Sequence, residues 1–441
     1  MNSSIKAGFA KVDITPPLGV GLAGYFSERL ADDILDPLYA SALVFANKCD
    51  MAVIMSCDFI GLGTNYADRA REMISNKLDI PKENIMIHST HIHTGPIVRD
   101  NPRERGKFAI SHKDESYLEM LLRKLCDAAY LAKRNMKSAK LSIGYGKEDS
   151  ISFIRRFRMK DGSIRTNPGV GNPDIVEPVG QINPTVGVIK VELADKREII
   201  IVNFALHPDI IGGSGISAGY PGRMRVALKR LLPNCEVLFL NGAAGDINHI
   251  DPMNPGNTSS GYKYATKVGN ILAAEVFKVL QKMKEHEGDI DIKAKTLNLK
   301  VSHRRVSDQE RQEAYELVKA FHSGEWEQKD MGSTTIIARA YQTLNLAEIP
   351  DRRYIQIQVL SIGGLNFTGL PGEVFSDIGR GIQTISPSKH TFVVSLVNGS
   401  HGYFPTEDAF AEGGYEVSNN PFTSKLEGVL LKGFKYIFDS M

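Results

Sequence analysis

The chain has 441 residues, of which 42% are hydrophobic and 24% are charged, and its formal net charge at pH 7 is +2. This composition is typical of a soluble globular protein with a full core, and the length predicts about two or three domains or one large α/β unit. The small net charge gives no support to nucleic-acid binding. No apolar run approaches the roughly 20 residues that a membrane-spanning helix needs.

The N-terminal residues and the spacing of the cysteines indicate the cellular compartment in which the protein is expected. The first residues, Met1 to Gly8, contain no apolar segment of a secretory signal. We therefore expect a cytoplasmic protein unless a signal was removed, in which case it is periplasmic or secreted. The cysteines are widely spaced and form no Cys-x-x-Cys pair; they are Cys49, Cys57, Cys126 and Cys235. This spacing predicts buried apolar side chains rather than disulfides or a thiolate metal site.

The first 90 residues predict two strands, a helix and a third strand, over 38–45, 51–57, 66–78 and 84–87. The helix rests on the 3.6-residue spacing of Ala67, Ala70, Ile74 and Leu78. A strand, a helix and a strand in this order form a βαβ unit, which binds ligands beyond the carboxyl ends of its strands.

The third of these strands leads into His88-Ser-Thr-His91-Ile-His93-Thr-Gly95-Pro96. Alternate side chains of an extended segment share a face, so His91 and His93 can point the same way. Neutral imidazoles are good zinc ligands. Loop histidines that bond to nearby backbone are the alternative, but the His-x-His spacing before Gly-Pro favours a metal site.

The middle of the chain predicts helices at 115–133, 222–232 and 262–284, and strands at 139–145, 186–193, 198–204 and 236–240. Arg155, Arg156 and Arg158 precede a Gly/Pro/Asn-rich stretch at 161–180 that predicts a long loop. A solvated turn is the favoured interpretation for Arg158, and a functional role is favoured for Arg155 and Arg156.

The last third predicts strands at 289–301, 354–362, 366–370 and 391–397, helices at 308–321 and near 336–344, and an apolar element at 429–437. The strand at 354–362 alternates apolar and polar residues, so one side should face solvent. Pro371-Gly372-Glu373 follows the strand at 366–370, and we expect Glu373 to begin a helix there.

Several of the predicted apolar strands end in polar residues beside Gly or Pro. The residues are His91, His93, His207, Asp246, Glu373 and Tyr403. His207, Glu373 and Tyr403 are each more often structural when they occur alone. Together they match the two or three histidines plus a carboxylate of a hydrolytic zinc site.

These motifs together resemble the neutral/alkaline (non-lysosomal) ceramidase family over almost the whole chain. Family members carry Thr-His-x-His-Ser-Gly-Pro, which is similar to Thr90-His91-Ile-His93-Thr-Gly95-Pro96 in this chain. The resemblance implies that His91 is a zinc ligand and that His93 contributes to catalysis.

The same resemblance implies the remaining ligands. A His-Pro pair at His207 and a Gly-Glu pair at Glu373 match the next two ligands, and Tyr403 matches the tyrosine that completes the set. Tyr415 follows twelve residues later, as in ceramidases.

Other matches concern the pocket and the arginines. The resemblance implies an arginine near the site, which corresponds to Arg155 or, less surely, Arg156, and a pocket-lining glycine at Gly24. Where ceramidases have Gly-Asp-x-Ser-Pro-Asn, this chain has Asp246 and Asn248 without the serine hydroxyl. Asp246 and Asn248 are both candidate catalytic residues. Asn248 can donate a hydrogen bond, but it cannot act as a nucleophile.

The sequence therefore predicts an α/β fold of mixed sheets with flanking helices and a metal site at the carboxyl ends of strands. We expect one ceramidase-like domain over 1–441, without the additional C-terminal β-sandwich domain of ceramidases. The expected activity is Zn²⁺-dependent hydrolysis, in which zinc-bound water attacks an amide or ester carbonyl while Arg155, Tyr415 or His93 stabilises the oxyanion.

The substrate is expected to be a small molecule, and ceramide itself is a doubtful candidate because the serine is absent. One alternative is a zinc enzyme that acts on a carbohydrate or another polar small molecule. Another is a protein that binds metal and ligand without catalysis. The oligomeric state stays open.

Overall fold

The larger of the two main β-sheets has nine strands, in the order β14-β12-β11-β6-β1-β3-β4-β5, with β16 beside β6. The computed structural model describes residues 5–99, 113–254, 256, 260–286, 290–349 and 352–441. The strands are β1 (Lys6–Asp13), β3 (Tyr39–Ala46), β4 (Met51–Cys57), β5 (Ile85–Ser89), β6 (Lys137–Lys147), β11 (Thr185–Leu193), β12 (Glu198–Phe204), β14 (Cys235–Asn241) and β16 (Lys284–Glu285).

Two βαβ units form the two ends of this sheet. Strands β4 and β5 are parallel and flank helix α1 (Thr64–Leu78), while β12 and β14 are parallel and flank α3 (Gly219–Leu231). The two ends of the sheet also meet, because the backbone N–H of Asn241 donates to Nε2 of His88 at 3.0 Å. The carboxyl ends of both βαβ units therefore lie close together.

A second sheet of four strands packs on the large one. Its order is β17 (Ile292–Ser302), β18 (Arg352–Ile362), β19 (Leu365–Gly369) and β21 (Thr391–Val394). Buried side chains such as Phe45 and Leu238 of the large sheet share one core cluster with Phe367 and Phe392 of the small one. The centre of the molecule is thus a two-sheet sandwich.

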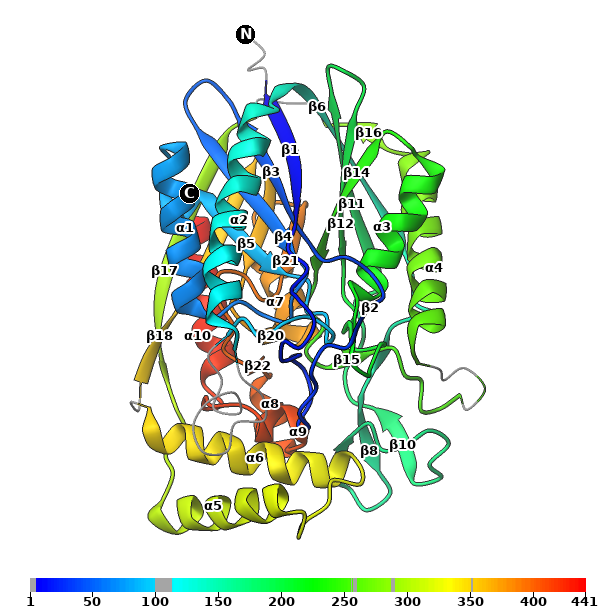
Figure 1. The fold of residues 1–441 in the computed structure, drawn as a ribbon, viewed down its shortest axis with the longest axis vertical. Coiled ribbons are helices and arrows are strands. Elements are labelled where there is room, and N and C mark those ends of the chain that lie inside the picture. The colour runs from blue at the N-terminus through cyan, green and yellow to red at the C-terminus, as the bar shows by residue number, and fades with distance from the viewer. Residues whose placement is uncertain (1–4, 100–112, 255, 257–259, 287–289, 350–351) are drawn as a thin grey trace.

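Helices cover both outer faces of this sandwich (Figure 1). Helices α1 and α2 (Glu115–Arg134) share a core cluster with one half of the large sheet, and α3 and α4 (Tyr262–Leu280) share another with its other half. Helices α7 (Ser376–Ile385) and α10 (Leu426–Ser440) cover the four-stranded sheet. The amphipathic pattern of α2 explains its place, since Leu118, Leu121 and Leu125 are all fully buried.

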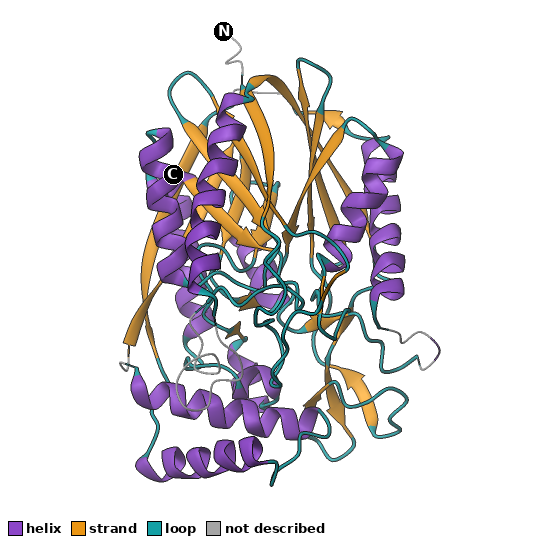
Figure 2. Cartoon of the chain, in the orientation of Figure 1, coloured by secondary structure: helices purple, strands orange, loops and turns teal. Residues whose placement is uncertain are grey.

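Smaller elements gather at one end of the sandwich, where loops from both sheets also converge (Figure 2). The helices there are α5 (Asp308–Ser323), α6 (Met331–Glu348), α8 (Glu407–Glu412) and α9 (Tyr415–Ser418). Short strands there form small sheets: β2 (Asp33–Ile34) with β13 (Gly215–Ile216), β7 (Phe153–Ile154) with β15 (Ile247–Asn248), β20 (Glu373–Val374) with β22 (Tyr403–Phe404), and β8 (Arg156–Met159) between β9 (Ile164–Thr166) and β10 (Ile175–Pro178). A 3-10 turn, η1 (Lys82–Asn84), precedes β5.

The α/β class with mixed sheets and flanking helices is confirmed, and several local predictions are wrong. Cys49 is exposed, although its spacing from the other cysteines predicted a buried side chain. The stretch 161–180 contains β9 and β10 instead of one long loop. Glu373 lies in β20, and the helix begins three residues later at Ser376. Strand β18 does not face solvent along its length, because Gln358 is 1% exposed and donates to the carbonyl oxygens of Glu83 and Ile85.

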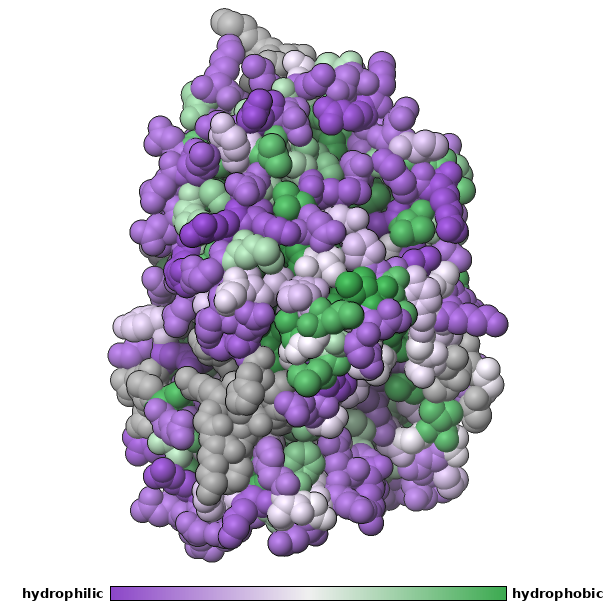
Figure 3. Space-filling model, in the orientation of Figure 1, coloured by the Kyte–Doolittle hydropathy of each residue, from purple (hydrophilic) through white to green (hydrophobic). Residues whose placement is uncertain are grey.

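The surface in Figure 3 is mostly hydrophilic, with apolar side chains gathered near the middle of this face. Within the described ranges, none of the helices combines the length and the apolar character needed to cross a membrane.

Candidate metal centre

His91 lies just beyond the carboxyl end of β5, where the chain turns sharply. Its φ of +69° is in the left-handed region, which is uncommon for a residue other than glycine and typical of strained functional sites. Nδ1 of His91 donates to the carbonyl oxygen of Ile60 at 2.7 Å. In the neutral ring the lone pair is then on Nε2, which points into the site.

His93 and His207 complete a cluster of three imidazoles. His207 follows β12, and its Nε2 lies 3.1 Å from Nε2 of His93. One ligand atom from each of His91, His93 and His207 can be chosen so that all lie within 4.8 Å of one another. Burial lowers the pKa of His207 to about 3 and holds the pKa of His93 well below its usual value, so both rings are neutral at pH 7. Neutral imidazole is the form that binds metal.

Gly24 packs directly against His93. A Cβ atom at this position would lie 2.7 Å from Nδ1 of His93, and the φ of +115° also favours glycine. The sequence-based placement of Gly24 beside the site therefore agrees with its position, and the requirement for glycine is steric.

Glu373 enters from the opposite side through the short strand pair β20–β22, which aligns it with Tyr403. Its Oε2 lies 3.2 Å from Nε2 of His91. The two atoms are not aligned for a hydrogen bond, and neither has another hydrogen-bond partner among the described residues. Burial favours the neutral carboxyl, but His91, His207 and Tyr403 outweigh it and hold the pKa of Glu373 below its usual range.

This arrangement fits a divalent metal ion. Zinc binds nitrogen and oxygen ligands at about 2.0–2.1 Å in a tetrahedron, which separates neighbouring ligand atoms by about 3.3 Å. The His91–Glu373 and His93–His207 separations of 3.2 and 3.1 Å match that value. Two buried polar atoms without partners are costly unless a ligand satisfies them.

Tyr403 lies 4% exposed beside Glu373, and burial together with that carboxylate raises the pKa of its phenol. Arg155 opposes this effect, since its guanidinium carbon is 5.2 Å from the centre of the Tyr403 ring. A cation in the site would act in the same direction and favour the phenolate. Two ligand sets therefore remain compatible with the geometry: His91 and His207 with Glu373 and Tyr403, or the three histidines.

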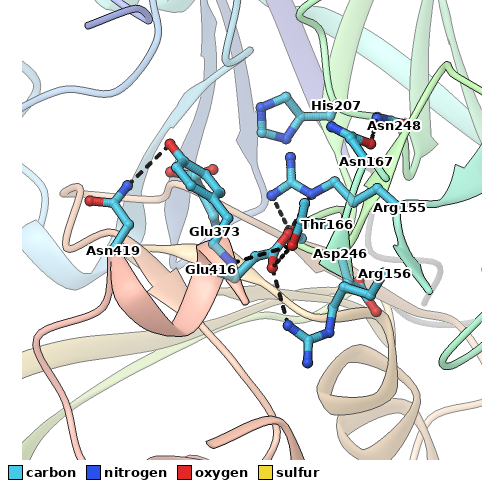
Figure 4. A network of polar contacts seen from close by, with 12 residues as sticks. Arg155, Arg156, Thr166, Asn167, His207, Asp246, Asn248, Glu373, Glu416 and Asn419 are labelled. Atoms are coloured by element: carbon cyan, nitrogen blue, oxygen red, sulfur yellow. Dashed lines mark hydrogen bonds and ion pairs between the residues drawn. The ribbon is translucent and has the colours of Figure 1, made fainter. Parts of the chain in front are cut away.

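Glu416 joins the two adjacent arginines (Figure 4). Nε of Arg155 donates to Oε1 of Glu416 at 2.8 Å, and Nη1 of Arg156 donates to Oε2 at 3.1 Å. Arg156 also reaches Glu412 and lies over Phe375, away from Tyr403. The structure thus distinguishes the two arginines, and Arg155 is the one that faces the site.

Arg158, by contrast, is exposed and pairs with the exposed Glu177. It is solvated as expected, but the prediction of a turn is wrong because Arg158 lies in strand β8. The Thr166 hydroxyl also donates to Oε2 of Glu416, at 2.8 Å. Burial opposes the charge of Glu416, but Arg155 and Arg156 outweigh it and lower the pKa of this carboxyl.

Asp246 and Asn248 lie behind the site, and their polar atoms have partners. Asp246 accepts from the backbone N–H and the hydroxyl of Ser376, both at 2.8 Å, and burial raises its pKa to about 6. Nδ2 of Asn248 donates to Oδ1 of Asn167 at 2.6 Å, while its Oδ1 accepts from the backbone N–H of Ile250. Their contacts are those of residues that fix loops, and their catalytic roles stay predictions.

A cavity of about 400 Å³ opens onto this centre. Six of the sequence-predicted residues line it: Gly24, His91, His93, Glu373, Tyr403 and Tyr415. Other described residues of its lining are mostly polar; they include Thr64, Asn65, Arg99, Gln342, Asn345, Arg353, Ser400, His401 and Asn419. The described lining does not include His207, Arg155, Arg156, Asp246 or Asn248.

Sequence reasoning missed two carboxylates that support the site. Glu416 directly follows Tyr415, and an acidic residue after a Gly-Gly-Tyr turn was the available signal. Asp209 follows His207-Pro208 by one residue, and its Oδ1 lies 3.1 Å from Nδ1 of His249. His207 and His249 outweigh the effect of burial and lower the pKa of Asp209.

Comparison with solved structures reveals similar folds. A crystal structure of neutral ceramidase from Pseudomonas aeruginosa aligns with a TM-score of 0.75 at 16% sequence identity, over 100% of this chain and 75% of that one. A structure described as ceramidase complexed with C2 aligns with a TM-score of 0.75 at 17% identity, over 98% of this chain and 74% of that one. No protein-family model and no curated protein sequence matches the chain. The fold expected from the histidine and Pro-Gly-Glu motifs is thereby confirmed: the chain has a neutral ceramidase-like fold.

Proposed function

We propose that this protein is a zinc-dependent hydrolase of an amide or ester bond in a small molecule. The observation that carries the proposal is a pair of buried atoms, Nε2 of His91 and Oε2 of Glu373, that have no hydrogen-bond partner in the part of the chain that the structure describes. They face each other at 3.2 Å on the wall of a cavity. The two similar structures are described as ceramidases, which supports amide hydrolysis.

His91, His207, Glu373 and Tyr403 are the proposed zinc ligands. When bound, zinc would supply Lewis acidity, which acidifies water and polarises a carbonyl oxygen. His93 lines the cavity as a neutral base, and in this proposal it accepts a proton from the attacking water. Tyr415 also lines the cavity, and in this proposal its phenol donates to the developing oxyanion.

Arg155 acts through its neighbours in this proposal. It does not line the cavity among the described residues, but its guanidinium lies against the Tyr403 ring and its Nη2 donates to the carbonyl oxygen of Gly245 at 2.6 Å. The positive charge beside Tyr403 favours the phenolate form of that ligand.

A polar substrate fits the cavity better than a ceramide with two long apolar chains. Gln342, Asn345 and Asn419 offer amide groups to the cavity, and Asn248 replaces the serine of ceramidases. This observation also favours the second candidate function, a zinc enzyme acting on a carbohydrate or another polar small molecule. Metal and ligand binding without turnover is the third.

Metal analysis of matched variants tests the ligand set. The wild-type protein should carry close to one zinc per chain, and His91→Ala, His207→Ala and Glu373→Gln should each lower zinc affinity at least about tenfold. His390→Ala and Glu285→Gln are the controls, because these side chains lie away from the cavity and should leave zinc unchanged. Stoichiometric, tightly held zinc in a His91→Ala/His207→Ala double variant would contradict the assignment.

A hydrolysis screen over N-acyl, ester and glycoside substrates tests the reaction. We expect turnover of a small amide or ester, loss of that turnover in Glu373→Gln, and weak or absent turnover of long-chain ceramides. Turnover that persists unchanged in Glu373→Gln contradicts the mechanism. Rapid cleavage of a natural ceramide contradicts the substrate class, and bound zinc without turnover of any substrate favours the binding protein.

A further inference from the structure

Another part of the cavity wall carries the guanidinium group of Arg353. Arg353 lines the cavity, and its Nη1 donates to Nδ1 of His401 at 3.0 Å. Among the described residues, no carboxylate lies within ion-pair distance of Arg353. Burial lowers the pKa of this guanidinium. A partly buried cation that hydrogen-bonds only a neutral ring is poorly compensated.

The hydrogen bonds of His401 leave donor groups directed at the cavity, and we call Arg353, His401 and Thr64 the donor wall. Nη1 of Arg353 can donate to Nδ1 of His401 only when that nitrogen carries no proton. Because Nδ1 accepts from Arg353, the ring proton is on Nε2, which donates to Oγ1 of Thr64 at 3.3 Å. The hydroxyl proton of Thr64 is then left to donate to a ligand.

Helix α1 adds to the same electrostatic environment. It begins at Thr64, its N-cap residue Gly63 provides no side-chain cap, and its first turn contains no acidic residue. Gly63, Thr64 and Asn65 all line the cavity. The amino end of a helix carries a partial positive charge, so it reinforces the nearby guanidinium.

The distribution of charge in the cavity separates this wall from the metal centre. Among the described lining residues, Glu373 is the only carboxylate, and it belongs to the metal centre. The guanidinium groups of Arg99 and Arg353 belong to the rest of the lining. This wall therefore fits a ligand group that brings negative charge and only accepts hydrogen bonds.

We propose that the substrate carries an anionic group, a carboxylate, sulfate or phosphate, which Arg353 and Thr64 bind. The inference rests on the proposed function, because it assumes that the scissile amide or ester of the same molecule lies at the metal centre. Arginine suits this role since its planar fork of N–H groups matches two oxygen atoms of such an anion. His401 is a positioning residue that orients Arg353 and Thr64.

Titration calorimetry of the zinc-loaded protein with succinate, inorganic sulfate and inorganic phosphate tests the anion site. We expect at least one of the three to bind at millimolar concentration, and the strongest binder identifies the anion class. Arg353→Gln should weaken it roughly 10- to 100-fold, as for loss of a hydrogen bond to a charged group, with Arg353→Lys in between. Arg158→Gln, which changes an exposed arginine of β8, should bind like the wild type.

The calorimetry overturns the inference if none of the three anions binds, or if Arg353→Gln binds them as tightly as the wild type, as expected for an anion held at the metal alone. Thr64→Val provides a second test if Arg353→Gln does not fold, because it removes one hydrogen-bond donor while keeping the shape of the side chain. Unchanged anion affinity of Thr64→Val also contradicts the inference. Zinc content and melting temperature, measured on each variant, separate loss of the site from loss of structure.

A pair of esters tests the same site in turnover. Mono-4-nitrophenyl succinate and 4-nitrophenyl butyrate differ chiefly in the terminal carboxylate. The ratio of their kcat/KM values should favour the succinate in the wild type and fall roughly 10- to 100-fold in Arg353→Gln. Zinc binding with butyrate turnover but no preference for the succinate overturns the inference alone. A protein that binds no zinc and shows no turnover overturns the proposed function, while the same calorimetry on the protein without zinc still reports on the anion site.

Discussion

At the level of single residues, the carboxylate of Glu416 connects the buried polar side chains behind the candidate site through hydrogen bonds. It is fully buried and accepts from Arg155, which directly precedes β8, from Arg156 of β8 and from Thr166 of β9. Through Arg155 it also fixes the cation that lies against Tyr403. Two guanidinium groups this deep in a protein are tolerated only when such a partner compensates them.

Glu416→Gln should therefore destabilise the protein strongly. Removal of one partner leaves buried charge uncompensated, and we expect a loss of about 3–5 kcal/mol in the free energy of unfolding, measured by urea denaturation. Glu177→Gln is the matched control, because Glu177 pairs with Arg158 at the surface and such pairs contribute about 0–1 kcal/mol. Equal effects of the two substitutions would show that burial does not decide the strength of the network.

At the level of elements, the two βαβ units hold the candidate ligands His91 and His207 at adjacent strand ends. The second unit depends on close packing of α3 against α4. Gly269 of α4 lies at that crossing, where a Cβ atom would come within 2.7 Å of the Cβ of Arg223 and the backbone nitrogen of Met224. Glycine is therefore required by the approach of two backbones and not by its own backbone conformation.

Gly269→Ala and Gly428→Ala should have opposite effects on stability. Alanine is favoured over glycine within a helix by about 1 kcal/mol, and at Gly428 of α10, where nothing lies within 4 Å of the added Cβ, this should raise the free energy of unfolding slightly. At Gly269 the clash should outweigh that gain and cost about 1–3 kcal/mol. Thermal unfolding of both variants measures the difference, and stabilisation at both positions would contradict the packing argument.

At the level of the whole molecule, the proposed ligands come from distant parts of the chain. His91 follows the first βαβ unit, His207 belongs to the second, and Glu373 and Tyr403 belong to the strand pair beside the four-stranded sheet. An ion held by all of them would crosslink segments that separate when the protein unfolds. Its binding free energy would then contribute to the stability of the entire fold.

Removal of zinc by a chelator should lower the melting temperature of the wild-type protein by several degrees. A ligand present at about 1,000 times its dissociation constant stabilises the folded state by about 4 kcal/mol. Glu373→Gln, which should bind zinc weakly, should show a much smaller change under the same treatment. Complete removal of zinc without any change in the melting temperature of the wild type would mean that the ion does not bridge these segments.

The sequence by itself determined the features that depend on local patterns. Helical spacing, as in Leu118, Leu121 and Leu125 of α2, and apolar runs such as β4 give the elements, because amphipathic burial acts within one helix or strand. The His-x-His and Pro-Gly-Glu motifs indicated the ceramidase-like fold and the candidate ligands through their resemblance to the motifs of the ceramidase family. The pairing of β4 with β5 also followed from the order of elements.

Only the tertiary structure decided which of these groups meet. Glu373 joins a strand through its pairing with Tyr403, thirty residues later, and such non-local pairing leaves no trace in local spacing. Arg155 differs from Arg156 in lying over the ring of Tyr403, a residue that is distant in the sequence. The burial of Gln358 depends on layers packed from both sides. The donor wall of Arg353, His401 and Thr64 likewise exists only because distant segments fold around one cavity.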